Sequence, residues 1–322
     1  MPALLFSLFL VVSLFVVGCS PAVQRVGDVI QSPELLENHL ITADGARLPV
    51  KIWSAGEEER VVLIAVHGFN DYRNGFSYPA SWWMQRGITT YAYDQRGFGE
   101  TLQTGIWATE EILTSDLKTL VEVVKAKNPY KPLYLLGESR GGAVVMASVT
   151  QENFPEVSGV ILSAPAVWGW KSLNIVYRSS LWLSAHMFGD LKATGQGLGI
   201  QASDNIPMLR NLGRDPLFIK KTRLDTVYGL VGLMDTAYDR AEKMTLPALV
   251  LYGKNDEVIP KKPVEDVVAR LPKSADIVLY ENGWHLLMRD LQAAVVWQDI
   301  EAWISARQIP SGNQITNLPL FP

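Results

Sequence analysis

A serine lies at the centre of the most distinctive motif in the sequence. Residues 137–142 read GESRGG, so Ser139 has one glycine two positions before it and another two positions after it. The apolar residues Leu133–Leu136 precede the motif and are typical of a buried strand, and a helix is predicted to follow it. A G-x-S-x-G turn between a strand and a helix is typical of a nucleophile elbow. We predict that Ser139 is a nucleophile; the alternative is that it only caps the helix.

A serine hydroxyl becomes a good nucleophile only when a base lies within hydrogen-bond reach. The chain has four histidines. His285 lies between the last predicted strand and the last predicted helix, at the sheet edge towards which the elbow also points. His67 follows an earlier strand and is better suited to positioning the backbone, His39 lies on an outer strand, and His186 lies in an aromatic-rich segment. We therefore predict that His285 is the base.

The base needs a carboxylate that fixes its tautomer and stabilises the imidazolium ion. Asp256 follows the preceding strand at a suitable distance and is our prediction for this role. Glu257 is adjacent but is expected to point elsewhere. Asp94 also ends a strand, but the tight RGFG sequence after Asp94-Gln95 favours a structural turn joined by Asp–Arg bonding. The predicted triad is thus Ser139, Asp256 and His285.

Acyl transfer also needs hydrogen-bond donors for the oxyanion that develops in the transition state. The backbone N–H of Arg140, directly after the nucleophile, is one predicted donor. The other is predicted to be the backbone N–H of Phe69, because Gly68 lets the loop after the first long strand turn sharply towards the pocket.

The elements that must position these residues alternate between short apolar runs and longer helical segments. Arg60–Val66 is typical of a buried strand, and Glu110–Lys127 has the spacing of an amphipathic helix. This alternation predicts a mostly parallel twisted sheet with helices on both faces, an α/β fold. The other predicted strands are His39–Thr42, Arg47–Trp53, Ile88–Tyr93, Leu133–Leu136, Gly159–Ser163, Ala248–Tyr252 and Ile277–Tyr280, and the other predicted helices are Ser77–Arg86, Gly141–Thr150, Lys262–Leu271 and Leu291–Ala306.

The alternation also predicts the domain organisation. Two parts, residues 37–166 and 246–307, form the predicted core, and residues 167–245 between them read as a helical cap or lid. Residues 19–36 are predicted to be a linker and residues 308–322 an extended tail.

Substrate specificity is expected to reside in the cap and in the pocket that it closes. Trp168, Trp182 and Trp284 are the residues that we expect to bind substrate. Aromatic side chains of the cap could hold an acyl chain or lie at a bilayer surface. The alternative is that they form the core of the cap itself.

The N-terminus has the pattern of an export signal. Residues 1–18 contain no charged side chain and are short for a membrane-spanning helix, which favours a signal peptide. Val16-Val17-Gly18-Cys19 resembles a bacterial lipobox, so we predict that Cys19 is lipidated and anchors the chain in a bacterial cell envelope, with the outer membrane favoured if the host is Gram-negative. The alternative is an uncleaved anchor helix.

Composition excludes several other classes. The chain of 322 residues has 29 Lys and Arg against 33 Asp and Glu, a net charge of −4, which excludes a nucleic-acid binder that relies on bulk electrostatics. A single cysteine excludes an intrachain disulfide and a Cys-rich zinc site. The motifs imply no metal or organic cofactor, and they do not predict the oligomeric state.

Together these motifs resemble the α/β-hydrolase superfamily over residues 37–306, and within it the monoacylglycerol lipase and lysophospholipase type of serine hydrolase. The resemblance rests on HGFNDY at 67–72, DQRGFGET at 94–101, GESRGG at 137–142, GKNDEVIP at 253–260 and GWH at 283–285. It implies that an acyl-enzyme on Ser139 cleaves a carboxylic ester, and that the substrate is lipid-like. The alternatives are an aminopeptidase similar to proline iminopeptidases, which share the DQRG turn, and a surface lipoprotein that only binds.

Overall fold

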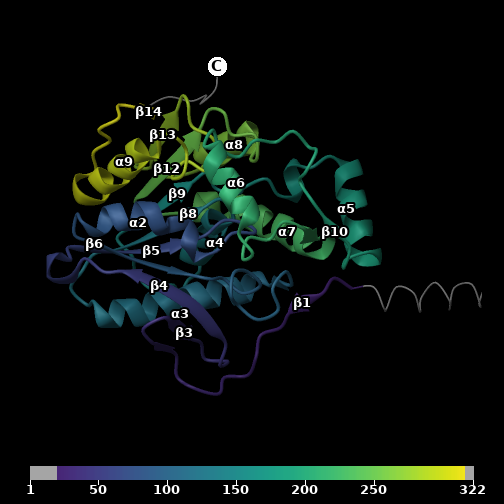
Figure 1. Ribbon diagram of the computed structural model, residues 1–322, viewed down its shortest axis with the longest axis horizontal. Coiled ribbons are helices and arrows are strands. Elements are labelled where there is room, and N and C mark those ends of the chain that lie inside the picture. Colours follow the sequence, from purple (N-terminus) through teal and green to yellow (C-terminus); the bar gives the residue numbers. More distant parts are fainter. Residues whose placement is uncertain (1–19, 316–322) are drawn as a thin grey trace, which may run out of the picture.

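The computed structural model describes residues 20–315, and their largest sheet has ten strands (Figure 1). In spatial order these are β14, β13, β12, β9, β8, β5, β6, β4, β3 and β2. Neighbours from β13 to β6 run parallel, and the pairs at both edges run antiparallel. The strands are β2 (Glu34–Leu35), β3 (His39–Ile41), β4 (Arg47–Trp53), β5 (Val61–Val66), β6 (Ile88–Tyr93), β8 (Leu133–Glu138), β9 (Gly159–Ser163), β12 (Ala248–Gly253), β13 (Asp276–Tyr280) and β14 (Gln314–Ile315).

Helices cover both faces of this sheet, which confirms the predicted α/β-hydrolase fold. Apolar residues of α3, α4, α7 and α8 belong to the core on one face, and those of α2 and α9 to the core on the other. The α-helices are α2 (Ser77–Met84), α3 (Glu110–Lys127), α4 (Arg140–Val149), α5 (Ile175–Met187), α6 (Ile206–Arg214), α7 (Leu224–Arg240), α8 (Lys261–Val268) and α9 (Ala293–Ala306), and the 3-10 helices are η1 (Gly56–Glu58), η2 (Arg73–Phe76), η3 (Trp170–Ser172) and η4 (Ala241–Lys243).

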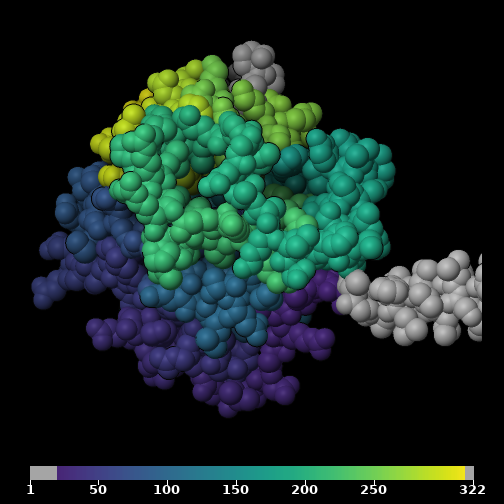
Figure 2. Space-filling view, turned by 45° about the vertical axis from the view of Figure 1, so that its right-hand side comes forward, coloured from purple at the N-terminus to yellow at the C-terminus, as the bar shows by residue number. Residues whose placement is uncertain are grey.

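Residues 167–245 lie between β9 and β12 in the chain and supply three further α-helices. They contain α5, α6 and α7, together with the two-stranded pair β10 (Lys192–Ala193) and β11 (Thr222–Arg223). In Figure 2 this teal and green part covers the middle of the visible face and stands in front of the core. We keep the word cap for residues 167–245.

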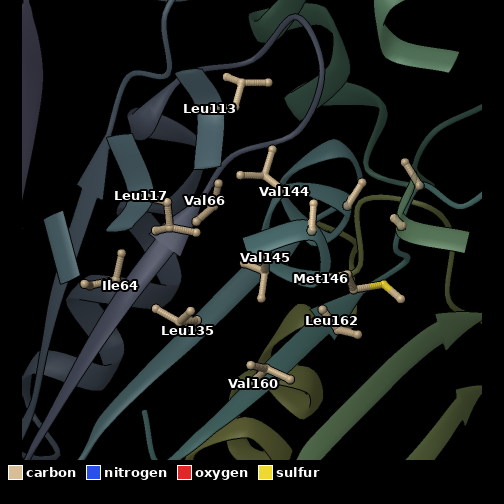
Figure 3. Close-up of a cluster of buried hydrophobic side chains, with 14 of the residues drawn as sticks. Ile64, Val66, Leu113, Leu117, Leu135, Val144, Val145, Met146, Val160 and Leu162 are labelled. Atoms are coloured by element: carbon tan, nitrogen blue, oxygen red, sulfur yellow. The ribbon is translucent and has the colours of Figure 1, made fainter. Parts of the chain in front are cut away.

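The larger core forms where α3 and α4 pack on the central strands (Figure 3). Ile64 of β5 and Leu135 of β8 face Val144 and Val145 of α4, with Leu117 of α3 beside them, and all five are fully buried. Burying apolar surface of this kind stabilises a domain by about 25 cal/mol per Å². This packing fixes β8 and α4, and therefore the turn between them.

Three short strands lie in the segments predicted to be a linker and a tail. β1 (Val23–Gln24) pairs in parallel with β7 (Trp107–Ala108), β2 pairs antiparallel with β3, and β14 pairs antiparallel with Ile277 and Val278 of β13. Strands of two residues are too short to show a hydropathy pattern. No helix within residues 20–315 is long and apolar enough to cross a membrane.

Candidate active site

The turn between β8 and α4 holds Ser139 in a strained backbone conformation. Its φ of 53° and ψ of −116° are unusual for a residue other than glycine. The flanking glycines permit this turn, because a Cβ atom on Gly141 would lie 1.9 Å from the carbonyl oxygen of Val66, and one on Gly137 would lie 2.5 Å from the backbone of Gly142. The geometry is that of a nucleophile elbow, and Ser139 projects from the carboxyl edge of the sheet.

The three predicted triad residues meet at this edge. The Nε2 atom of His285 lies 3.0 Å from Ser139 Oγ, and its Nδ1 atom lies 2.8 Å from Asp256 Oδ2. His285 comes from the loop after β13, and Asp256 from the loop after β12. All three side chains are buried. A buried chain of hydrogen bonds in this order can take the proton of the serine hydroxyl as it attacks.

Backbone amides fix the orientation of the carboxylate. Asp256 Oδ1 accepts hydrogen bonds from the N–H groups of Val258 and Ile259, at 2.8 and 3.0 Å, which leaves Oδ2 for His285. The neighbouring Glu257 is exposed and accepts from the backbone N–H of Gln201 in the cap. Asp94 forms an ion pair with Arg73 and accepts hydrogen bonds from the backbone N–H groups of Arg73 and Glu100. These contacts stabilise the turn after β6.

The electrostatic surroundings favour the protonated form of His285. Burial alone lowers its pKa, but the charge and hydrogen bond of Asp256, together with the negative charge of Glu138, more than offset burial and the opposing Arg289. The net result raises the pKa of His285 above its ordinary value of 6.5. A histidine with this bias is suited to accept and hold a proton during the reaction.

The loop after β5 lies directly against Ser139. A Cβ atom on Gly68 would lie 3.4 Å from the Cβ of Ser139, and Phe69 lines the same pocket. His67 supports this loop, because its Nδ1 donates to the Gly68 carbonyl at 2.9 Å and its Nε2 accepts from the Gln95 N–H at 3.0 Å. Burial holds the pKa of His67 well below its ordinary value, so this histidine stays neutral in its supporting role.

Arg140 contributes its backbone, and not its side chain, to the surroundings of Ser139. The N–H of Arg140 opens helix α4 next to Ser139, where helix N-termini favour negative charge. Its fully buried guanidinium group lies 3.8 Å from the centre of the Phe98 ring and is not part of the pocket wall. Burial lowers the pKa of Arg140 to about 9.

A cavity of about 330 Å³ opens above Ser139 and His285. Its walls are mostly apolar, and the cap supplies several of them: Ala202, Leu209, Leu212, Gly213 and Phe218. Phe69, Val258 and Leu286 complete the apolar part from the core. The three predicted substrate-binding tryptophans do not line this cavity. Trp168 packs on the core, and Trp182 is 51% exposed and stacks on His186. Trp284 is half-buried, and its backbone N–H donates to Asp290 Oδ2.

Three charged residues at the site were not predicted from the sequence. Asp71, Glu138 and Arg289 line the cavity and form a buried ion-pair cluster. Glu138 lies inside the elbow motif and Asp71 inside the loop after β5, so both were adjacent to predicted residues. No spacing rule links them to Arg289, which comes together with them only in the fold.

The three triad residues follow one another along the chain in the order Ser, Asp and His, and each lies at the carboxyl edge of a mostly parallel sheet. Together with the serine on an elbow, this order defines the α/β-hydrolase class. Residues 57–292 match the model of the family described as "Serine aminopeptidase, S33", and the chain belongs to this family.

Several relatives of known activity are similar over most of the chain. A "Monoacylglycerol lipase" from Mycolicibacterium smegmatis is 24% identical over 282 residues, which cover 83% of this chain and 96% of the relative. The human "Monoglyceride lipase" is 25% identical over 289 residues, covering 85% and 92%. Among solved structures, a soluble variant of monoglyceride lipase from Saccharomyces cerevisiae has a TM-score of 0.72 at 20% identity and covers 88% of this chain and 97% of that one.

Proposed function

We propose that this protein hydrolyses lipid-like carboxylic esters, of the monoacylglycerol or lysophospholipid type, through an acyl-enzyme on Ser139. The Oγ atom of Ser139 attacks the ester carbonyl carbon while His285 takes its proton. The backbone N–H groups of Phe69 and Arg140 stabilise the oxyanion. His285 then gives the proton to the departing alcohol oxygen, and the C–O bond breaks. A water molecule, activated by the same histidine, releases the acid and restores Ser139.

The observation that carries this proposal is a complete hydrogen-bonded triad opening into an apolar cavity. Ser139 and His285 form one side of a space whose remaining walls include Leu209, Leu212 and Phe218. Such walls suit an acyl chain. The names of relatives that span most of this chain, monoacylglycerol and monoglyceride lipases, point the same way.

The second candidate is an aminopeptidase, in keeping with the description of the family. An aminopeptidase of this kind would need acidic cap residues near the substrate amine. Among the described residues of the cap, those that line the cavity are Ala202, Leu209, Leu212, Gly213 and Phe218, and none of them is acidic. The acidic residues of the cavity wall, Asp71 and Glu138, come from the core and are both paired with Arg289. The ester reading is therefore preferred.

Substrate comparison tests the choice between the two. Purified protein should hydrolyse 1-monoacylglycerols and p-nitrophenyl esters, with kcat/KM rising from short to medium acyl chains because the cavity buries more apolar surface. Proline p-nitroanilide should be a poor substrate. Hydrolysis of the anilide without hydrolysis of any ester would contradict the proposal and favour the aminopeptidase.

We also propose that the chain is anchored to a bacterial membrane through lipidated Cys19. This residue lies outside the described residues, and the proposal rests on the apolar segment before it and on the position of the residues that follow it. The N–H of Ala22 donates to Asp225 of α7 at 3.2 Å, and Pro21 and Val23 border a cavity that His186 of α5 also lines. In Figures 1 and 2 the first described residues, from residue 20 onwards, lie beside the end of α5.

The exposed side chains of α5 support a membrane-facing orientation. Of the 13 residues of this helix only Ala185 is buried, although most of the others are apolar. In α5 and the four residues after it, the apolar side chains that are at least 48% exposed are Ile175, Val176, Tyr177, Trp182, Leu183, Met187, Phe188 and Leu191, which we call the α5 surface. An anchor at Cys19 would hold the α5 surface at the bilayer, where aromatic and aliphatic side chains partition favourably.

Two measurements test the anchoring. Labelled palmitate should be incorporated into the parent protein and not into Cys19→Ala; failure of the parent to incorporate the label would contradict lipidation.

The sheet, the apolar cores and the triad lie within residues 20–315, so a form beginning at Ser20 retains them. This form should bind lipid vesicles, and Leu183→Asp should weaken binding about tenfold.

The matched control for the vesicle measurement is Tyr130→Asp. Tyr130 is 95% exposed and precedes β8, at the edge of the sheet opposite to Ser139. This variant should bind vesicles like the parent. Equal binding by parent and Leu183→Asp would contradict the role of the α5 surface, whatever the outcome for Cys19.

A further inference from the structure

The cap contacts the loop after β5 through three hydrogen bonds. The backbone N–H of Ile219 donates to the carbonyl oxygen of Asn70 at 2.9 Å, and Asn70 Nδ2 donates to Thr222 Oγ1 at 2.8 Å. The hydroxyl group of Tyr72 donates to Asp215 Oδ2 at 2.7 Å. All three partners from the cap lie between the end of α6 and the start of α7. The triad chemistry uses none of these bonds, so they need their own explanation.

Asn70 has a backbone conformation that few residues adopt. Its φ of 63° lies in the left-handed region, where asparagine is among the best tolerated residues other than glycine. Its Oδ1 atom has no hydrogen-bond partner among the described residues, so the side chain is held through the bond from Nδ2 to Thr222. A residue in such a conformation keeps it only where its surroundings hold it. Because the cap bonds both the side chain and the carbonyl group of Asn70, the cap supplies part of that support.

The conformation of Asn70 matters because the residue before it is Phe69, whose N–H is an oxyanion donor in the proposed function. The carbonyl group of Gly68 and the N–H of Phe69 belong to one planar peptide group and point in opposite directions. His67 Nδ1 donates to this carbonyl at 2.9 Å, which directs the N–H of Phe69 to the other side. The core therefore holds this peptide group, and the cap holds the residue that follows it.

The segment of the cap that makes these bonds is itself held in place. It ends in β11, which pairs antiparallel with β10, and near its start the N–H of Leu217 donates to Asp215 Oδ1 at 2.9 Å. Between these two points Phe218 lines the catalytic cavity. One segment of the cap thus places an apolar wall of the cavity and also supports the loop that carries Phe69.

We propose that Asn70 and Thr222 are positioning residues for the oxyanion hole, because the hydrogen bond between them joins the loop after β5 to the cap and holds the N–H of Phe69 where the oxyanion forms. This deepens the proposed function and rests on it. Neither Asn70 nor Thr222 lines the catalytic cavity. Loss of their bond should therefore lower kcat, through a misplaced donor, and leave substrate binding nearly unchanged.

Kinetics of variants at the two positions test this role with p-nitrophenyl octanoate as the substrate. Thr222→Val removes the hydroxyl group and keeps the shape of the side chain. In this variant kcat should fall about tenfold, and KM should change by less than about twofold. Thr222→Ser keeps the hydroxyl group and should have a kcat within about twofold of the parent.

Changes at Asn70 test whether the two residues act through one shared bond. Asn70→Gly removes the side chain and still permits the φ of 63°, so its kcat should fall by about the same factor as in Thr222→Val. The double variant should lose no more than either single variant, because both remove the same interaction. A double variant in which the two losses multiply would contradict the shared bond.

The matched control is Thr194→Val, which makes the same change at an exposed threonine of the cap whose Oγ1 accepts from the N–H of Gln196 at 3.2 Å. It should leave kcat and KM at their parental values. A parental kcat in Thr222→Val, a loss that Thr222→Ser shares in full, or a loss confined to KM would overturn the positioning role and leave the esterase intact. Failure of the parent to hydrolyse the ester would instead contradict the proposed function, and the positioning role with it.

Discussion

Helices α4 and α5 are both apolar, but the protein uses them in opposite ways. In α4, nine of ten residues are buried, and the helix begins directly after Ser139. In α5, one of thirteen residues is buried. The apolar residues of α4 therefore stabilise the fold and hold the elbow, whereas most of those of α5 contribute little to folding. The comparison separates a rigid catalytic edge from a cap whose apolar surface remains available for contacts outside the chain.

The largest expected effect concerns the catalytic edge. Asp256→Asn should lower kcat/KM by about 10³ to 10⁴, because the amide cannot hold the tautomer of His285 in the same way. Glu257→Gln, at the next residue, should have little effect, since Glu257 contacts the cap backbone and not the histidine. Steady-state kinetics on the same ester for both variants checks this. Similar losses in the two variants would mean that the carboxylate has been wrongly assigned.

Adding a side chain should destabilise the protein at a glycine of the elbow but not at a glycine in a loop of the cap. Gly141→Ala should destabilise the fold by about 3 kcal/mol or prevent folding, since its Cβ would lie 1.9 Å from the Val66 oxygen. Gly195→Ala should be neutral or stabilising by up to about 1 kcal/mol, since nothing lies within 4 Å of its Cβ. Urea unfolding measures both. A neutral Gly141→Ala would contradict the tight packing of the elbow.

The same substitution in the two helices sharpens the comparison. Val145 in α4 is fully buried, and Val176 in α5 is 70% exposed. Val145→Ala should lower the free energy of unfolding by about 2 kcal/mol through the cavity that it leaves. Val176→Ala should change it by no more than about 0.5 kcal/mol. Comparable losses would mean that α5 is packed more tightly than its exposure indicates.

The smallest expected effect is a shift in the pH profile. The base must be neutral to act, so kcat/KM should fall as the pH drops through the raised pKa of His285, and this acidic limb should lie above pH 6.5. Glu138→Gln removes a negative charge that raises this pKa, so the limb should move to lower pH. Arg178→Gln, on exposed α5, should leave it in position. A limb that does not move in Glu138→Gln would exclude this coupling.

The signals for Ser139, Asp256 and His285 in the sequence are local, so the meeting of these three side chains at one edge of the sheet could be predicted. The strand–turn–helix pattern around Ser139 and the loops that carry Asp256 and His285 depend on nearby residues, and they meet as expected. The cluster of Asp71, Glu138 and Arg289 could not be predicted in the same way, since its members meet only through long-range packing. The cap is similar: aromatic residues mark it as apolar, but composition does not distinguish cavity walls such as Leu212 from exposed Trp182.

Covalent labelling tests the central claim, that Ser139 is the nucleophile, most directly. A fluorophosphonate should form one adduct, and mass spectrometry should locate it on the peptide that contains Ser139. The adduct should be absent in Ser139→Ala, should form much more slowly in His285→Ala, and should form at the parental rate in Glu257→Gln. A parent that does not react, or a Ser139→Ala variant that is labelled as fast as the parent, would contradict the account.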